Sequence, residues 1–383
     1  MGSEGRARRA ALYAGGFIGP FGGGMVTVLI PELRDAFGVS TATTSLALTS
    51  YLVPFAALQL VSGTLGERFG RARATRVAFI VYGLASAWAA LAGSFVPFLV
   101  ARAVQGAANA FTTPLVLAAL ADITEERELG RTMGTFAAVQ TAGVVGAPLI
   151  GGLAGGFDYR LAFVAAAVAA LALAALSTPP RRRAAAVEVA APEARFVDAI
   201  TPRTRWTAGA AFLAFFAITG LGVVVALRAG DAFGLGPTAR GLLLAAFGAA
   251  GVVAGRPAGG LSDRRGAVPV ALAGALACVV LLPLLGAVGG AVGLGLLWLA
   301  TGVASALLWA GLNVLTVGAA PANRGGAVSL IGAFKFTGNA LAPVAWLPVY
   351  AAGGELAFLG AGAVCLLLAL TVARAGAAAV ARA

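Results

Sequence analysis

The chain has no histidine, two cysteines and a single lysine, and only 11% of its 383 residues are charged. Without histidine, imidazole-based metal centres and catalytic triads are excluded. The lysine, Lys335, is followed by Phe336, so no phosphate-binding loop of the Walker type is present. The cysteines, Cys278 and Cys365, fall in apolar segments and are expected to be packing residues. The sequence therefore lacks the residues that soluble-type enzyme chemistry, and ATP-driven transport by this chain alone, would require.

Apolar residues make up 60% of the sequence, which also holds 54 glycines and has a mean hydropathy of +0.93. A helix of roughly 20 apolar residues crosses the bilayer core, and the continuous apolar runs exclude the alternating pattern of a membrane β-barrel. We therefore predict an all-α membrane protein with twelve transmembrane helices. The first apolar run follows basic residues but lacks a small-residue cleavage site, so it is expected to be a retained span. The spans are predicted at residues 10–30, 44–62, 74–93, 95–121, 132–155, 158–177, 206–227, 238–260, 268–288, 290–319, 326–350 and 354–374.

The net charge of +12 at first suggests a nucleic-acid partner, but its distribution does not. If both termini are cytoplasmic, most arginines fall in cytoplasmic segments, and the outer loops hold only Arg34, Arg160, Arg228 and Arg240. This excess follows the positive-inside rule. The sequence therefore predicts a multi-pass protein of the cell membrane with cytoplasmic termini and without a nucleic-acid partner.

Two landmarks recur at nearly constant spacing. The stretch 67–70, ERFG, is followed 196 residues later by 263–266, DRRG; the glycine and proline that bound 143–148 recur 195 residues later at 338 and 343. An internal duplication of six spans explains both offsets, and such repeats are a transporter architecture with the substrate site between the halves. The predicted parts are a first six-helix half at 1–177, a cytoplasmic linker at 178–205 and a second six-helix half at 206–383.

The loop after the second span, residues 63–73, reads GTLGERFGRAR, and we refer to it as the latch loop. It resembles the signature of the major facilitator superfamily, Gly-x-Leu-x-Asp-Arg-x-Gly-Arg-x-Arg, with glutamate in place of aspartate; residues 259–266 match its weaker echo. The resemblance covers all twelve spans and implies the major facilitator fold, in which this loop is thought to latch the outward-facing state. The alternative is a basic hairpin that only anchors topology. The latch residues expected on this basis are Gly63, Glu67, Arg68, Gly70, Arg71, Asp263, Arg264 and Gly266.

The fourth span contains an arginine, Arg102, deep enough in the bilayer that its side chain should face protein or a watery cavity. Gln105 and Asn109 follow on the same helical face. The stretch Arg102-x-x-Gln105-Gly106 resembles a superfamily motif whose arginine is implicated in proton coupling, which implies that role for Arg102. The alternative is a structural arginine bonded to backbone carbonyls.

The fifth span carries GVVGAPLIGG at 143–152, in which small residues allow close helix contact and the proline bends the span. It resembles the motif of the antiporter branch, Gly-x-x-x-Gly-Pro-x-x-Gly-Gly, except that Ala147 replaces a glycine. The resemblance favours export, and generic packing is the alternative. The residues of this packing motif are Gly143, Gly146, Pro148, Gly151 and Gly152.

All fifteen acidic residues fall in loops or at span ends, whereas Arg102 and Lys335 lie within spans. A cavity with cations and no mid-depth anion would repel lipophilic cations and favour neutral or anionic solutes. Lys335 aligns with Gln140 at the 195-residue offset, so this position should face the interior in both halves. Three roles for Lys335 remain open: a proton-loading amine, a cation that holds an anionic solute, or a charge satisfied by carbonyls or water. Asn339, one turn onward, either contacts substrate or bonds between helices.

The sequence therefore predicts a secondary active transporter, not an enzyme, that exports small amphiphilic solutes from the cytoplasm in exchange for protons. Transport would proceed by rocking of the two halves, with the proton gradient as energy source and no cofactor. The expected partners are a small-molecule substrate and the lipid bilayer, and the chain is expected to be a monomer. Two alternatives remain: uptake or facilitated exchange of a specific metabolite on the same fold, and a transporter-like receptor or membrane enzyme without transport.

Overall fold

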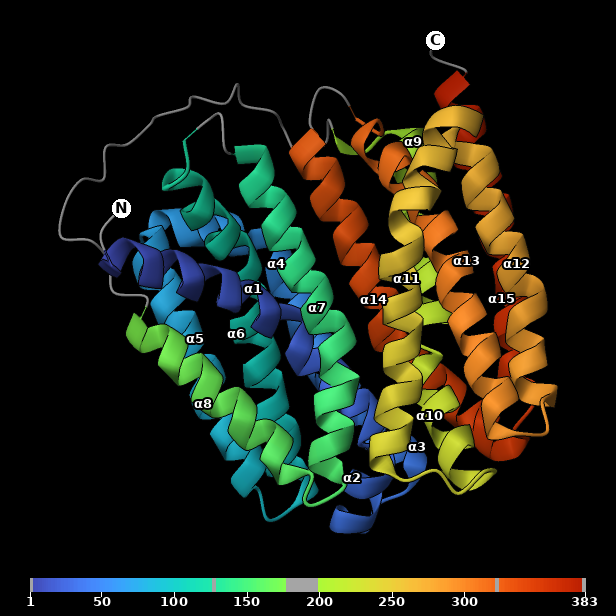
Figure 1. The fold of residues 1–383 in the computed structure, drawn as a ribbon, viewed down its shortest axis with the longest axis horizontal. Coiled ribbons are helices and arrows are strands. Elements are labelled where there is room, and N and C mark those ends of the chain that lie inside the picture. The colour runs from blue at the N-terminus through green and yellow to red at the C-terminus, as the bar shows by residue number, and fades with distance from the viewer. Residues whose placement is uncertain (1–2, 126–128, 177–198, 321–323, 381–383) are drawn as a thin grey trace.

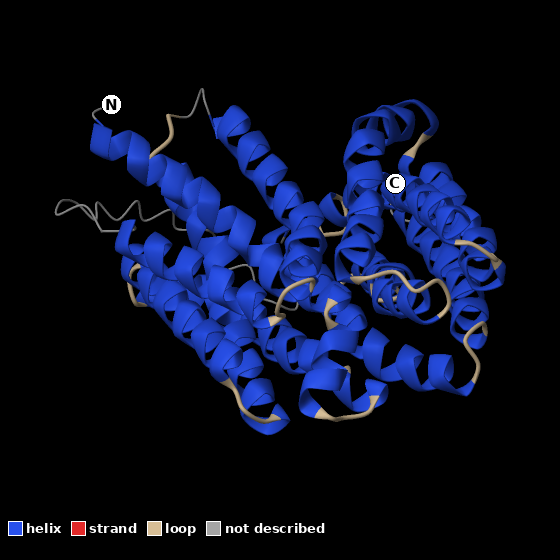
Figure 2. Ribbon diagram, turned by 60° about the horizontal axis from the view of Figure 1, so that its bottom comes forward, coloured by secondary structure: helices blue, strands red, loops and turns tan. Residues whose placement is uncertain are grey.

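The structure, a computed structural model, describes residues 3–125, 129–176, 199–320 and 324–380. All its regular elements within these ranges are helices joined by short loops (Figure 2), which confirms the all-α prediction. The first half comprises α1 (Ser3–Val28), α2 (Ile30–Phe37), α3 (Thr41–Thr44), α4 (Leu46–Arg68), α5 (Arg71–Leu91), α6 (Phe95–Asp122), α7 (Leu129–Gly155) and α8 (Arg160–Leu176). The second comprises α9 (Pro202–Ala214), a π-helical turn (Phe215–Thr219), α10 (Gly222–Asp231), α11 (Pro237–Arg265), α12 (Ala267–Ala287), α13 (Ala291–Val317), α14 (Arg324–Ala352) and α15 (Leu356–Val380).

The twelve predicted spans correspond to these helices in order. Ten helical stretches of the described chain are long and apolar enough to cross a membrane. The other two predicted spans are α6, which carries the polar residues of the fourth span, and α8, an apolar helix of 17 residues. The short helices α2 and α3 lie between the first two spans, where the sequence predicted only a loop.

Matched contacts show the duplication within each half. Gly106 of α6 lies so close to α4 that a Cβ atom would be 2.0 Å from the carbonyl oxygen of Tyr51. In the second half, a Cβ on Gly302 of α13 would be 2.4 Å from the carbonyl oxygen of Phe247 on α11. Both members of the second pair follow their counterparts by 196 residues, so the same helix crossing is built twice.

A second matched crossing joins the first and fifth spans of each half. A Cβ on Gly143 of α7 would lie 2.4 Å from the carbonyl oxygen of Phe17, and a Cβ on Gly338 of α14 would lie 2.3 Å from that of Phe212. Here both residues of the second pair follow their counterparts by 195 residues. The two-repeat fold predicted from the sequence is therefore present. Most of the predicted linker, 178–205, lies outside the described residues.

The two halves lie side by side, with α1–α8 in blue to green and α9–α15 in yellow to red (Figure 1). Both chain ends lie at the same end of the bundle, which we call the terminal end; α2 and α3 lie at the opposite, far end (Figure 1). The halves meet where α7 packs on α11 and where α4 packs on α14. These two seams enclose the centre of the molecule.

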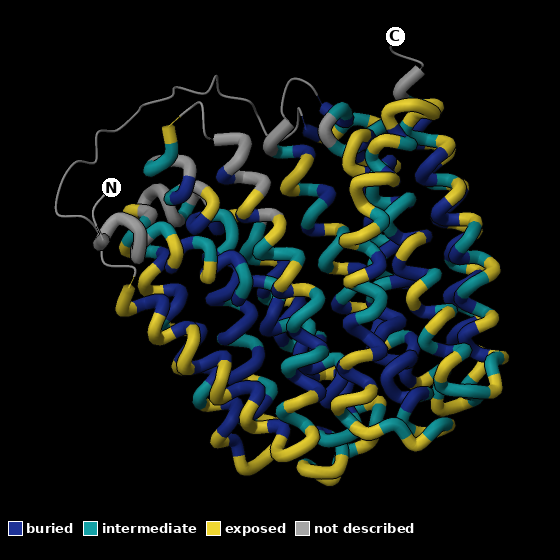
Figure 3. Tube along the Cα trace, viewed as in Figure 1, coloured by how far each residue is buried: buried dark blue, intermediate teal, exposed yellow. Residues whose placement is uncertain are grey.

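Exposed positions run along the outer surfaces of the bundle, while the helix faces that meet one another are buried (Figure 3). Many of the exposed side chains are large and apolar, among them Val168, Val253, Leu296 and Leu370. A hydrocarbon environment suits such a surface, because apolar side chains gain nothing from contact with water. The protein is a multi-pass membrane protein.

The seventh span is interrupted by the π-helical turn at Phe215–Thr219, between α9 and α10. The sequence predicted one continuous helix at 206–227, because an apolar run does not distinguish α-helical from π-helical spacing. A π-helical turn inserts one residue into the helix and is frequent at functional sites. Phe215, Thr219 and Gly220 of this region line the central cavity described below.

Candidate functional site

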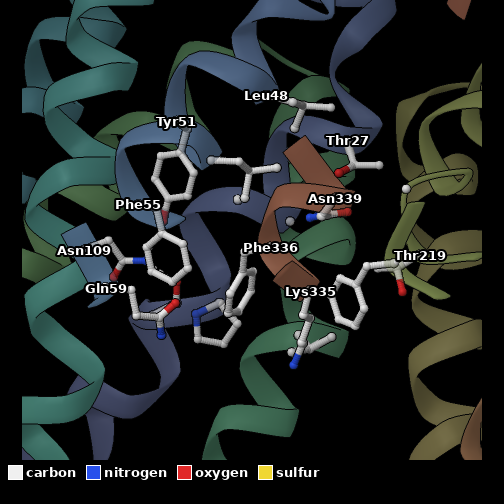
Figure 4. A pocket seen from close by; sticks show the side chains of 18 of the residues that line it. Thr27, Leu48, Tyr51, Phe55, Gln59, Asn109, Thr219, Lys335, Phe336 and Asn339 are labelled. Carbon is white, nitrogen blue, oxygen red and sulfur yellow. Dashed lines mark hydrogen bonds between the residues drawn. The ribbon is translucent and has the colours of Figure 1, made fainter. Parts of the chain in front are cut away.

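A cavity of about 640 Å³ lies between the two halves (Figure 4). Its volume is in the range of sites for drug-sized ligands. Helices α1, α4, α6 and α7 of the first half and the π-helical turn, α10, α13 and α14 of the second half contribute to it. A solute bound there would contact both halves.

The cavity wall combines rings and uncharged polar groups with a single charged side chain, Lys335. None of the lining residues is an aspartate or a glutamate. The lining amides belong to Gln59, Asn109, Gln140, Asn313 and Asn339, and the hydroxyls to Thr27, Tyr51, Thr113, Thr141 and Thr219. The wall therefore offers hydrogen bonds from many directions and a positive charge from one.

Lys335 of α14 points its ammonium into a cage of three rings. The Nζ atom lies 4.7 Å from the ring centroid of Phe215, 5.3 Å from that of Trp309 and 5.1 Å from that of Phe336. The described residues provide no ion pair to this ammonium. Because ring faces attract cations, the cage supplies part of the stabilisation that a carboxylate would otherwise give. Gln140, the counterpart of Lys335 in the first half, also lines the cavity.

Arg102 of α6 is fully buried and lies outside the cavity wall. Its Nε donates to the carbonyl oxygen of Ala47 at 3.1 Å, and its Nη1 donates to that of Gly22 at 3.0 Å and to the side-chain oxygen of Gln105. The guanidinium carbon stacks 4.3 Å from the ring centroid of Tyr51. Arg102 thus joins α6 to α1 and α4, and Gln105 supports it rather than facing a substrate.

Asn109, two turns along α6, connects this network to the cavity. Its side-chain nitrogen donates to the carbonyl oxygen of Gly19 and to the hydroxyl of Tyr51, both at 2.6 Å. Asn109 and Tyr51 both line the cavity, whereas Arg102 is separated from it by the Tyr51 ring. A displacement of the Tyr51 side chain at the cavity wall would therefore act directly on Arg102.

The second half has a packed counterpart of the Arg102–Tyr51 pair that sequence inspection overlooked. Trp298 and Phe247 follow them by 196 residues, and their rings stack with centroids 4.6 Å apart. Applying the duplication offset to every polar intramembrane residue would have found this pair. The position is thus a packing position in both halves, and only the first half fills it with a charge.

The packing motif of α7 lies against two different helices. Cβ atoms on Gly143 and Gly151 would collide with backbone carbonyls of α1, and one on Gly152 would lie 2.5 Å from the carbonyl oxygen of Pro237 in α11. Gly146 faces the ring of Phe17 on α1. Pro148, the remaining member, is buried, and its carbonyl oxygen would lie 2.4 Å from a Cβ on Gly241 of α11. The motif therefore spans both a contact within the first half and the seam between the halves.

The latch loop contains the turn from α4 to α5. Gly70 has a φ of 84°, and Gly266 at the matching turn from α11 to α12 has a φ of 91°, conformations that other residues adopt rarely. Asp263 and Arg264 are exposed at the end of α11. The side chains of Glu67, Arg68 and Arg71 and the surroundings of Gly63 lie outside the described part of the structure, so the role of the loop as a latch stays a prediction.

The structure thus gathers Asn109, Lys335 and Asn339 at the cavity and separates them from Arg102 and Gln105. The aromatic lining, notably Tyr51, Phe55 and Phe215, was not singled out from the sequence. In an apolar chain with 21 phenylalanines, a ring that faces a cavity has no sequence signal that distinguishes it from a ring in the core.

Two six-helix repeats around a central cavity, in a chain with lipid-compatible outer surfaces, define a membrane transporter. The chain belongs to the Major Facilitator Superfamily: the sequence profile of that family matches residues 12–221 and 207–378. The family is one of membrane transporters rather than enzymes.

Several relatives carry names related to drug resistance. The chain is 33% identical over 164 residues to the puromycin resistance protein pur8 of Streptomyces alboniger, over 42% of this chain and 33% of the relative. It is 31% identical over 153 residues to the multidrug resistance protein B homolog of Mycobacterium tuberculosis (strain ATCC 25618 / H37Rv), over 39% of this chain and 28% of the relative. The matches thus cover about a third or less of these relatives.

Solved structures share the fold at low identity. A bacterial homolog of the human lysosomal transporter Spinster, inward-facing and unoccupied, matches with a TM-score of 0.78 and 17% identity, over 99% of this chain and 98% of that one. The human organic anion transporter MFSD10 matches with a TM-score of 0.68 and 17% identity, over 97% of this chain and 100% of that one. These likenesses concern the fold alone.

Proposed function

We propose that this protein exports small amphiphilic solutes, neutral or anionic rather than cationic, from the cytoplasm in exchange for protons. It acts in the cell membrane with both termini in the cytoplasm, and the proton gradient is its energy source. The relatives named for puromycin and multidrug resistance support export, although each is matched over only part of its length.

The observation that carries the proposal is the composition of the central cavity. Among the described residues that line it, Lys335 is the only charged one and none is acidic. A lipophilic cation entering this space would meet an ammonium without a compensating carboxylate, which disfavours its binding. Neutral and anionic solutes meet amide and hydroxyl donors, and the rings accommodate their apolar parts.

The contacts between the halves support alternating access. At the far end, α7 meets α11 at Gly152, and Arg240 of α11 pairs with Glu32 of α2. At mid-height, the ring of Phe55 on α4 meets that of Phe336 on α14 with centroids 4.8 Å apart. With cytoplasmic termini, the far end faces outward, so this arrangement corresponds to a state closed toward the outside. Rocking of the halves would break these contacts and expose the cavity on that side.

Inverted membrane vesicles test the proposal directly. A proton gradient, acidic inside, would be imposed on the vesicles. They would then be given fluorescent amphiphiles that differ only in bearing an anionic, neutral or cationic group. We expect uptake of the anionic and neutral probes into vesicles that contain the protein, and its loss when an ionophore collapses the gradient. Vesicles without the protein serve as control. Accumulation of the cationic probe alone, or accumulation unaffected by the ionophore, would contradict the proposal.

A further inference from the structure

Five aromatic rings form a continuous path from the first half to the second, and four of them, those of Tyr51, Phe55, Phe336 and Phe215, line the cavity. In order, the ring centroids of Tyr51 and Phe55 are 6.2 Å apart, those of Phe55 and Phe336 4.8 Å, those of Phe336 and Phe215 6.0 Å, and those of Phe215 and Trp309 5.3 Å. All these separations are typical of interacting aromatic pairs. We call these five residues the ring path.

The ring path ends at Lys335, the cation among the described residues of the cavity wall. Its last three members, Phe336, Phe215 and Trp309, are the rings that enclose the Lys335 ammonium. Figure 4 shows Phe55, Phe336 and Lys335 beside one another at the centre of the cavity. Ring faces and a positive charge are therefore presented together, within the length of one small molecule.

The chemistry that fits this arrangement is a planar aromatic ring with an acidic group. A flat ring stacks on or packs edge-to-face against members of the path, and this contact does not require a particular substituent. An anionic oxygen accepts a charge-assisted hydrogen bond from Lys335, which has no carboxylate partner among the described residues. The amide of Asn339, one turn from Lys335 on α14, and that of Asn313, one turn from Trp309 on α13, also line the cavity and can bond to a second acidic oxygen.

We infer that the cavity selects planar aromatic acids, with Lys335 recognising the acid and the ring path recognising the aromatic plane. The inference rests on the proposed function, because it names the solute class of the same cavity. An acid without a ring can bind only to Lys335, and a ring without an acidic group can contact only the ring path. Both features together should give a preference that neither gives alone.

Binding to the purified full-length protein in lipid nanodiscs tests the inference without requiring transport. Four probes of similar size separate the two features: naphthoate, the neutral naphthylmethanol, the non-aromatic decalin carboxylate and the cationic naphthylmethylamine. We expect naphthoate to bind roughly tenfold or more tighter than naphthylmethanol and naphthylmethylamine, as the loss of a hydrogen bond to a charged group predicts, and about threefold or more tighter than decalin carboxylate, as the loss of an aromatic contact predicts. Isothermal titration calorimetry measures all four on one scale.

Three variants assign the preference to residues. Lys335→Gln should reduce naphthoate affinity to that of naphthylmethanol and leave naphthylmethanol unchanged. Phe336→Leu should weaken both naphthyl probes and leave decalin carboxylate unchanged. Phe334→Leu is the matched control, because Phe334 lies on the same helix, is exposed and is not a lining residue; it should bind all probes as the wild type does.

The results separate the inference from the proposed function. If naphthoate, naphthylmethanol and decalin carboxylate bind equally, or if Lys335→Gln keeps the preference for naphthoate, the inference is wrong even when vesicle assays show export of other neutral or anionic solutes. If naphthoate binds with the expected preference but vesicles show no proton-driven accumulation, the inference holds and the proposed export is wrong. If no probe binds while other anions are exported, the aromatic selection is also wrong.

Discussion

Arg240 of α11 forms an ion pair with Glu32 of α2 that joins the two halves at the far end of the bundle. Arg240 is only 3% exposed. It lies in the first turn of α11, where the helix dipole disfavours a cation. The Glu32 carboxylate therefore supplies the compensating negative charge. Gly230 of α10 packs beside the arginine, and a Cβ there would be in ordinary van der Waals contact with its Cδ at 3.6 Å.

Neutralising this contact should favour the state that is open at the far end. Glu32→Gln removes the carboxylate and leaves a buried guanidinium without its partner, so we expect the ratio of far-end-open to far-end-closed molecules to rise roughly tenfold or more. Distances between spin labels placed across the far end measure the populations.

Asp35→Asn provides the control for Glu32→Gln. Asp35 lies on the same short helix, but it is exposed and pairs with its neighbour Arg34 rather than with the second half. Arg34 also faces Asp231 of α10 at this end. If Asp35→Asn shifts the populations as much as Glu32→Gln, the effect arises from the general charge of the far end and not from the Glu32–Arg240 pair.

At the terminal end, a substitution in the latch loop should shift the populations of the two states in the opposite direction. If Glu67, Arg68 and Asp263 stabilise the outward-facing state, Glu67→Gln should lower its population while leaving folding and insertion intact. Labelling of single cysteines accessible only from the outside, compared between wild type and variant, measures this change. Equal labelling would leave the loop as a basic hairpin that anchors topology.

The Arg102 network predicts graded losses of transport. Arg102→Ala leaves the carbonyls of Ala47 and Gly22 without their donor and opens a void, which should destabilise the protein by ~3 kcal/mol and abolish transport. Arg102→Lys should retain part of the activity, because one ammonium cannot reproduce the planar donor fork that reaches two helices. Proton-driven transport and thermal unfolding are measured together. Full transport by Arg102→Ala would mean that Arg102 only packs and has no role in transport.

The second half supplies a sharper variant for the same residue. The double change Tyr51→Phe with Arg102→Trp copies the Phe247–Trp298 stack into the first half. The double variant fills the void but leaves the carbonyls of Ala47 and Gly22 without their donor and removes the hydroxyl that Asn109 bonds, so it should recover only part of the stability lost in Arg102→Ala. If Arg102 only packs, transport should recover together with stability; if Arg102 couples protons, proton-driven transport should stay absent. Exchange of solute without a gradient would distinguish a loss of coupling from a loss of binding.

The fold was largely predictable because the signals that specify it are local. Apolar runs located the spans, and a repeated acid, arginine and glycine located the duplication that Gly70 and Gly266 now show as matched turns. The same offset correctly pointed Lys335 and Gln140 toward a shared interior. These inferences needed only residue type and spacing.

The contacts between the halves were not predictable, because they join positions without any local signal. Glu32 and Arg240 are 208 residues apart; Glu32 falls in a predicted outer loop, and Arg240 lies at the start of the span predicted at 238–260. The cage around Lys335 draws its rings from three separate segments, and each ring alone resembles a core residue. Such pairings depend on how the two halves meet, which composition and periodicity do not encode.

The glycines of α7 predict two different outcomes for the same change. A Cβ on Gly152 would lie 2.5 Å from the carbonyl oxygen of Pro237 and 2.9 Å from the Cα of Gly241, across the seam between the halves. Gly152→Ala should therefore disfavour the far-end-closed state, and this effect should not depend on pH. Gly143→Ala collides instead with the Phe17 carbonyl within the first half, so it should lower thermal stability by ~1–3 kcal/mol without favouring either state.

Gly332→Ala on α14 completes this comparison, because a Cβ there meets no atom within 4 Å. Spin-label distances across the far end and thermal unfolding, measured for all three variants, check both expectations. The two changes perturb the far end in different ways, because Gly152→Ala adds a steric clash and Glu32→Gln removes a charge. Unchanged far-end populations in Gly152→Ala would mean that the α7–α11 contact persists when the transporter opens, and that the halves do not separate at this seam.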